Sequence, residues 1–392
     1  MRLLFLTHRV PYAPNRGDRI RAYHLLRYLK ANGIPVCLVA LAHDREEIAE
    51  ATRLSSLVDA LHIVRVTRGW NLMKAGFLLA TERPLTHVML DGRQMRPILE
   101  RVRREWQPDV VLAFCSGMAR FAMEPPLDTL PFVLDMVDVD SFKWEALAER
   151  ARGPRRWVYR REARVLRRFE AAATRTARST LVVSARECVA LRSLDAVFSP
   201  TVVPNGVDVE AFRNKGQAAS CPEVVFTGVF SYQPNEEGAL WLMDDVWPRL
   251  AQSNARLVLV GAGPSQALRK RAALAGVEVT GAVPDVRPYL WRGTIAVAPL
   301  TTARGVQNKV LEAVAAGLPA VVTPAVYEGL PAGVRPACRV ANGAADFAGA
   351  IRDLLRRSKE DLRTIASRAS FDELAWETCL APVGGILARV AG

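Results

Sequence analysis

Hydrophobic residues along this chain gather in short runs that alternate with longer segments of mixed polarity. Between the first two runs, Asp18–Ala31 carries apolar residues at helical spacing and is followed by Asn32 and Gly33, which favour helix termination. Continuous apolar runs separated by helices are typical of parallel strands that are buried on both faces. The first half therefore predicts a doubly wound α/β domain. Its expected strands are Arg2–Thr7, Pro35–Ala40, Asp109–Phe114, Pro131–Met136 and Ser179–Ser184.

The same alternation restarts after Pro204. The connecting stretch contains Asn205-Gly206, a turn signal, and then a polar segment, residues 213–220. At 392 residues the chain exceeds the ~250–300 residues at which one hydrophobic core stops growing. We therefore predict two domains, residues 1–203 and 204–370, followed by a C-terminal helix over Phe371–Arg389. The expected strands of the second domain are Glu223–Gly228, Ala255–Gly261, Thr294–Pro299 and Pro319–Pro324.

Six scattered cysteines, none in CxxC spacing, argue against a zinc ribbon, a disulfide framework or a redox pair. They fit a reduced cytoplasm. No apolar run approaches the ~18 residues that span a bilayer, and the N-terminal run is only as long as a strand, unlike a signal peptide. We expect a cytoplasmic protein that is soluble or bound at the periphery of the inner membrane.

The formal net charge of +13 predicts attraction to polyanions: nucleic acid, anionic lipid or phosphorylated small molecules. Arginines concentrate in Arg152–Arg168, interleaved with apolar residues such as Trp157 and Val165. That pattern suits a surface helix resting on anionic lipid, and it equally suits an ordinary amphipathic helix with a solvated face. No RNP, KH or zinc-finger pattern supports nucleic acid.

The segment Ala298–Pro324 carries the most chemistry. A strand ends at Pro299, a glycine-containing loop follows, and a helix runs to Ala316 with Gly317 as its C-terminal cap. The loop therefore leads to a helix N-terminus at the carboxyl end of a parallel strand. Free N–H groups and the positive end of the helix dipole attract phosphate there.

Charged side chains flank this helix N-terminus. Arg304 and Lys309 could neutralise a diphosphate, and Glu312, one turn beyond Lys309 on the same face, could accept hydrogen bonds from a ribose diol. The alternative is an ordinary Lys309–Glu312 helical salt bridge beside a plain strand-to-helix loop.

The string KVLEAVAAGLPAVVT in this segment resembles the donor site of glycosyltransferase family 4, retaining enzymes with the GT-B fold. Four further motifs recur in the family's order. They are VPNGVD (Val203–Asp208), FTGVFSYQPNEEG (Phe226–Gly238), VLVGAGP (Val258–Pro264) and VTGAVPDVRPYL (Val279–Leu290). Within the family, LDMVDVDSFKW (Leu134–Trp144) and the ARGVQNK loop resemble the sugar transferases of exosortase and PEP-CTERM exopolysaccharide systems.

This resemblance implies two Rossmann-like domains facing a cleft, with residues 371–392 crossing back onto the first. The first domain is expected to bind a glycan or lipid-linked acceptor, and the second a nucleotide-diphosphate sugar, with no cofactor or metal. Glu312 takes the family's ribose-binding role. Gly17 lies in the loop that approaches donor phosphate, and Asp138 lies near the position where relatives place a His beside the reacting sugar.

Two departures from the family shift the expected contacts. Gly305 stands where many members carry a sugar-binding Glu, which leaves sugar recognition to the backbone of Gly305 and Val306 or to Gln307 and Asn308. The turn at Gly228 lacks the Arg and Lys that often follow it. We therefore assign the diphosphate to Arg304 and Lys309, with Gly228 as a backbone contact.

Two short motifs and two other functions were weighed against this hypothesis. GAGP (Gly261–Pro264) lacks the third glycine of a dinucleotide fingerprint, so we expect a tight turn with Pro264 at the helix start. The DVD of Asp138–Asp140 imitates a metal-binding DxD, but three-residue matches are common by chance. The alternatives are a nucleotide-sugar epimerase of the same architecture and a non-catalytic binder of anionic lipid or nucleic acid.

Overall fold

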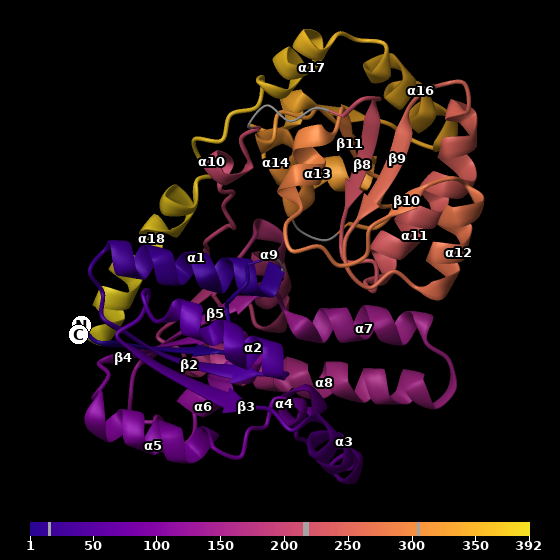
Figure 1. Ribbon diagram of the computed structural model, residues 1–392. Coiled ribbons are helices and arrows are strands. Elements are labelled where there is room, and N and C mark those ends of the chain that lie inside the picture. Colours follow the sequence, from indigo (N-terminus) through magenta and orange to yellow (C-terminus); the bar gives the residue numbers. More distant parts are fainter. Residues whose placement is uncertain (15–16, 215–218, 304–305) are drawn as a thin grey trace. The chain divides into compact units, whose positions relative to one another are not determined.

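The computed structural model describes residues 1–14, 17–214, 219–303 and 306–392, and it divides into two compact units (Figure 1). The first unit comprises Met1–Asn205 and Cys379–Gly392, and the second comprises Gly206–Thr378. The chain thus leaves the first unit two residues beyond the predicted boundary at residue 203. The last helix, α18 (Trp376–Ala391), begins five residues later than predicted, and most of it belongs to the first unit.

The first domain is a seven-stranded sheet in the order β3-β2-β1-β4-β5-β6-β7, and each described strand pair is parallel. Its strands are β1 (Leu3–Thr7), β2 (Val36–Ala42), β3 (Ala60–Arg65), β4 (Val110–Phe114), β5 (Phe132–Val137), β6 (Ser179–Val182) and β7 (Thr201–Val202). Its helices are α1 (Gly17–Ala31), α2 (Arg45–Glu50), α3 (Arg68–Phe77), α4 (Leu85–Met89), α5 (Met95–Glu105), α6 (Ser116–Ala122), α7 (Asp140–Arg150), α8 (Gly153–Thr176) and α9 (Ala185–Leu194).

The second domain is a six-stranded parallel sheet in the order β10-β9-β8-β11-β12-β13. Its strands are β8 (Glu223–Thr227), β9 (Arg256–Val260), β10 (Glu278–Val279), β11 (Ile295–Ala298), β12 (Ala320–Val322) and β13 (Cys338–Val340). Its helices are α10 (Val209–Phe212), α11 (Gln233–Trp241), α12 (Gln266–Leu274), α13 (Arg287–Arg292), α14 (Asn308–Ala315), α15 (Pro324–Glu328), α16 (Ala344–Leu355) and α17 (Lys359–Ala366).

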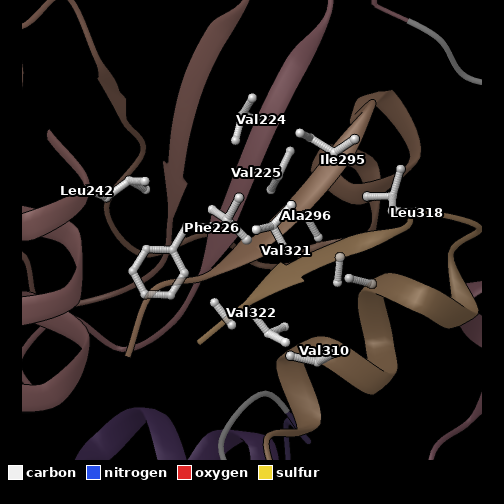
Figure 2. Packing of buried hydrophobic residues seen from close by; sticks show 14 of the residues in the cluster. Val224, Val225, Phe226, Leu242, Ile295, Ala296, Val310, Leu318, Val321 and Val322 are labelled. Carbon is white, nitrogen blue, oxygen red and sulfur yellow. The ribbon is translucent and has the colours of Figure 1, made fainter. Parts of the chain in front are cut away.

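Burial explains why both sheets are parallel. Every residue of β1, β2, β4, β8 and β11 is buried, as expected for strands covered by helices on both faces. Figure 2 shows the apolar cluster of the second domain, in which Val310 of α14 joins Phe226 of β8 and Val322 of β12. The predicted fold class, two doubly wound parallel-sheet domains, is confirmed.

The structure corrects the predicted strand list and one helix start. Four strands were missed: β3, which is mostly half-buried, and the two- or three-residue strands β7, β10 and β13. Pro264 does not start a helix. Ser265 caps α12 by accepting a hydrogen bond from the Leu268 N–H at 3.1 Å, and α12 begins at Gln266.

A buried ion pair fixes the end of the first domain. The Arg21 guanidinium on α1 bonds Asp135 of β5 at 2.8 Å, and both side chains are fully buried. Arg21 also donates to the Val203 carbonyl at 2.9 Å and to the Asn205 Oδ1 at 3.1 Å. The segment that leads out of the first domain is therefore held by a charge that has no access to water.

Across the described ranges, no helix combines the length and the apolar character that crossing a bilayer requires.

Candidate functional site

The second sheet reverses its winding direction between β8 and β11. From β8 the chain moves outward to β9 and β10, then returns to place β11 on the other side of β8 and continues to β12 and β13. In open parallel sheets, ligands bind outside the carboxyl ends of the two strands at such a switch point. The loops that follow β8 and β11 meet at this place, and the predicted donor residues of the second domain lie on these loops and on α14.

The N-terminus of α14 opens at this switch point. Gln307, the residue before the helix, makes no side-chain cap to the first turn. Asn308, the first helical residue, has a buried Oδ1 atom with no hydrogen-bond partner among the described residues. Buried polar atoms are rarely left unpaired, so this oxygen is a candidate ligand contact beside the positive end of the helix.

Lys309 turns toward the loop that follows β8. Its ammonium donates a hydrogen bond to the Asn235 Oδ1 at 2.5 Å and lies 4.9 Å from the centroid of the Phe226 ring. Asn235 is itself fixed, because its Nδ2 donates to the Val229 carbonyl at 2.8 Å. Burial lowers the pKa of Lys309 to about 7, and only the negative charge of Glu312 opposes this.

Glu312 lies one turn farther along α14. Burial raises its pKa to about 7, and the Lys309 charge opposes this shift. Among the described residues, the Lys309 ammonium bonds to Asn235 and forms no ion pair with Glu312, so the simple helical salt bridge is not present. The pKa values of both groups thus lie near 7, although both groups are fully ionised in water at that pH. A ligand that carries phosphate and hydroxyl groups can stabilise the charged form of each.

Glycines bring the surrounding loops into contact with one another. A Cβ atom on Gly228 would lie 3.2 Å from the Lys309 Nζ. One on Gly261 would lie 1.8 Å from the Gly228 carbonyl oxygen, and Gly263, with a φ of +69°, packs against Ser231. The glycines of GAGP therefore serve close packing between the β8 and β9 loops, which supports the interpretation as a turn.

The structure brings together Gly228, Val306, Gln307, Asn308, Lys309 and Glu312 within the second domain. Val306 packs against the domain core. Two predicted site residues, Arg304 and Gly305, lie outside the described residues. Asn235 and Phe226 were missed by the sequence reasoning. Their only signal was their place in the quoted motif after β8, since no spacing rule links Asn235 to Lys309, 74 positions away.

The remaining predicted residues belong to the first domain. Gly17 is the first residue of α1. The Asp138 carboxylate forms an ion pair with the Lys143 ammonium at 2.9 Å, and Lys143 also bonds Asp140 at 2.9 Å. A lysine ammonium thus lies between the two acids of the DxD-like motif, and the described residues contain no group of three acidic, His or Cys side chains suited to a metal ion.

Two residues of the Arg-rich helix α8 have structural roles. Arg161 is buried and donates to the Leu79 carbonyl at 3.1 Å and to the Arg83 carbonyl at 2.8 Å. Its neighbour Glu162 accepts the Leu85 and Thr86 N–H groups at 3.0 and 2.8 Å, which caps α4. Arg161 is therefore not available to anionic lipid, and a membrane contact through Arg152–Arg168 stays a prediction for the exposed arginines of that stretch.

Comparison with known proteins agrees with the geometry of the second domain. Residues 221–357 match the family model described as Glycosyl transferases group 1. This segment contains β8, β11 and α14, and thus the predicted donor-binding residues of the second domain. No curated protein sequence matches the chain.

Solved structures of similar fold cover nearly the whole chain. HepE from Anabaena, determined with UDP and glucose, is 15% identical over 99% of this chain and 100% of its own, with a TM-score of 0.69. WaaG, a glycosyltransferase involved in lipopolysaccharide biosynthesis, is 17% identical over 98% of this chain and 100% of its own, with a TM-score of 0.63. TarM is 8% identical over 98% of both chains, with a TM-score of 0.69. The chain has the GT-B fold, and the family match together with this fold supports a glycosyltransferase.

Proposed function

We propose that this chain is a retaining glycosyltransferase of family 4 that uses a nucleotide-diphosphate sugar and no metal. Its acceptor is a lipid-linked or polysaccharide glycan, and its role is in exopolysaccharide biosynthesis of the exosortase-associated kind. It works in the cytoplasm at the surface of the inner membrane. The acceptor is assigned to the first domain, with Asp138 as the candidate catalytic residue near the reacting sugar and Gly17 as a candidate contact of the donor phosphate.

One observation carries this proposal: the switch point of the second sheet gathers a helix N-terminus, a half-buried lysine and a half-buried carboxyl group. The diphosphate is assigned to the first turn of α14 and to Lys309, with Arg304 and Gly305 as further candidates. The ribose diol is assigned to Glu312, and the sugar to the loop of Val306, Gln307 and Asn308. Each side chain then meets the ligand group whose charge or hydrogen-bonding capacity matches its own.

The proposed chemistry follows from the position of the charges. The bond between the anomeric carbon and the diphosphate oxygen breaks while a bond to the acceptor hydroxyl oxygen forms on the same face of the sugar. The hydroxyl proton passes to the leaving diphosphate. The α14 N-terminus and Lys309 stabilise the negative charge that develops on that leaving group, where low polarity strengthens the interaction.

UDP is the first nucleotide to test. Three structures of the Anabaena protein HepE hold UDP with glucose, UDP alone or UDP-glucose. The fold that this chain shares with HepE supports the same donor class, although the nucleobase contacts of this chain are its own.

Thermal unfolding with UDP, GDP, ADP and their sugar derivatives tests the donor site. A nucleotide at 100 times its dissociation constant stabilises the folded protein by about 2.7 kcal/mol. We expect one nucleotide series to raise the unfolding temperature of the wild type, and the Glu312→Ala variant to lose most of that response. A flat response of the wild type to all nucleotides would overturn the proposal.

Product analysis separates the two alternative functions. A nucleotide-sugar epimerase converts its donor without an acceptor, whereas a glycosyltransferase releases nucleotide diphosphate and forms a glycosylated product only when an acceptor is present. A non-catalytic binder does neither. Acceptor-dependent release of nucleotide diphosphate is the result we expect.

A further inference from the structure

Helix α3 exposes large apolar side chains on its outer face. Trp70, Leu72, Met73 and Phe77 are 50%, 65%, 57% and 86% exposed. Of the described residues on this short helix, Asn71 and Ala75 are the buried ones. A helix on a protein surface normally turns its apolar face inward and its polar face to water, so the amphipathicity of α3 is inverted.

Polar contacts hold α3 in this orientation. The buried Asn71 side chain donates to the Met89 carbonyl at 3.3 Å and to the Asp91 carbonyl at 2.8 Å. The Lys74 ammonium, also on the inner side, forms an ion pair with Asp91 at 2.5 Å. The polar residues of α3 therefore anchor the helix to the domain, and its apolar residues remain for another partner.

The segment that follows α3 is also fixed, by hydrogen bonds to buried side chains of α8. The buried Arg161 of α8 donates to carbonyls between Leu78 and Arg83, and Glu162 caps α4. Because this buried pair fixes the C-terminal end of α3, the exposure of the helix does not come from a loosely attached segment. The fold of the domain therefore fixes this apolar face in its exposed position.

One arginine contacts this apolar face, and others are exposed at the start of α3 and in the segments after it. The Arg93 guanidinium lies 5.5 Å from the centroid of the Trp70 ring. Arg68, Arg83 and Arg96 are exposed nearby in the sequence. On α8, Trp157, four positions before the buried Arg161, is also exposed.

We propose that α3 is a membrane-docking helix that places Trp70, Leu72, Met73 and Phe77 in the headgroup region of an anionic bilayer. Apolar and aromatic side chains next to exposed arginines are typical of helices that lie in the bilayer interface. The net charge of +13 favours a lipid surface of opposite sign. This inference rests on the proposed function, which places the protein at the surface of a membrane. It deepens that function by assigning the membrane contact to α3.

Cosedimentation of the full chain with lipid vesicles tests the proposal. The probes are vesicles of phosphatidylcholine alone and vesicles that also contain phosphatidylglycerol. The wild type is expected to bind the anionic vesicles, with binding that weakens as salt rises. Replacing Trp70, Met73 and Phe77 together with serine is expected to lower the partition coefficient by roughly a hundredfold or more, since each buried apolar side chain contributes roughly tenfold.

A matched control uses exposed apolar residues elsewhere. The double variant Val197→Ser and Leu274→Ser removes side chains that are 86% and 82% exposed and lie outside α3. It is expected to bind vesicles as the wild type does. Far-ultraviolet circular dichroism checks that both variants are folded.

Three results would overturn the proposal: no binding of the wild type to anionic vesicles, equal binding by the triple variant, or an equal loss in the control. A dimer that dissociates only in the triple variant would assign the face to a second copy of the chain instead. Nucleotide-induced thermal shifts, measured on the same variants, are expected to stay unchanged. They test the donor site separately, so that failure of either claim can be recognised without the other.

Discussion

Replacing Lys309 with arginine should remove a pH dependence that the lysine imposes on donor binding. Burial lowers the Lys309 pKa from 10.5 to about 7, so the wild type loses the ammonium form as pH rises through neutrality. If the diphosphate binds only that form, donor affinity falls about tenfold for each pH unit above 7. An arginine at this position stays charged throughout, because guanidinium pKa values lie above about 12.

The affinity of the wild type should also fall on the acid side. The Glu312 pKa is raised to about 7, so its carboxylate is lost as pH falls, and the ribose hydroxyls lose their acceptor. The predicted affinity of the wild type is therefore bell-shaped with a maximum near pH 7. The Lys309→Arg variant should keep the acid limb and lose the alkaline limb.

Isothermal titration calorimetry with a nucleotide sugar, such as UDP-glucose, measures both limbs, since its diphosphate diester does not titrate near neutral pH. At pH 8 the wild type should also take up protons on binding, which repeated titrations in buffers of different ionisation enthalpy detect. Constant affinity of the wild type between pH 7 and 9, or the same alkaline decline in Lys309→Arg, would refute the reasoning.

Three further predictions concern stability, each measured by urea unfolding. Burial raises the pKa of Glu170 from 4.5 to about 8. The stability that its protonated form provides is therefore complete below about pH 4.5 and is lost as pH rises through about 8. The Glu170→Gln variant should flatten that decline, and an unchanged pH profile of stability would count against this reasoning. Arg21→Leu leaves the buried Asp135 carboxylate unpaired and should lower the free energy of unfolding by about 3–5 kcal/mol, and a loss below about 1 kcal/mol would contradict this. Gly261→Ala should destabilise the protein by more than about 2 kcal/mol, because the new Cβ atom would meet the Gly228 carbonyl oxygen. Gly349→Ala in α16 should be neutral or stabilising, because no neighbour lies within 4 Å of its Cβ position. Equal effects of the two variants would refute the packing argument.

The fully buried strands are predicted well, because a continuous apolar run between two helices indicates a parallel strand that is covered on both faces. The prediction fails for β3, since a mostly half-buried strand lacks such a run, and for β7, β10 and β13, whose two or three residues form no apolar run. The α14 segment is predictable because the strand, loop, helix and cap are local features.

Contacts that depend on tertiary structure could not be predicted in this way. The partner of Lys309 is Asn235, on another helix, and a lysine so placed shifts its pKa only because the fold excludes water from it. The arginines of α8 are alike in the sequence, but only the folded chain shows that Arg161 is buried against the α3–α4 connection. The inverted orientation of α3 likewise depends on Asn71 finding its carbonyl partners.

The most direct test of the donor site is a crystal structure of the chain with the nucleotide sugar that gives the largest thermal shift. The account predicts the diphosphate at the first turn of α14 beside Lys309, with the ribose hydroxyls within hydrogen-bond distance of the Glu312 carboxylate. A nucleotide bound away from the carboxyl ends of β8 and β11, with Lys309 still bonded only to Asn235 and Glu312 uncontacted, would contradict it.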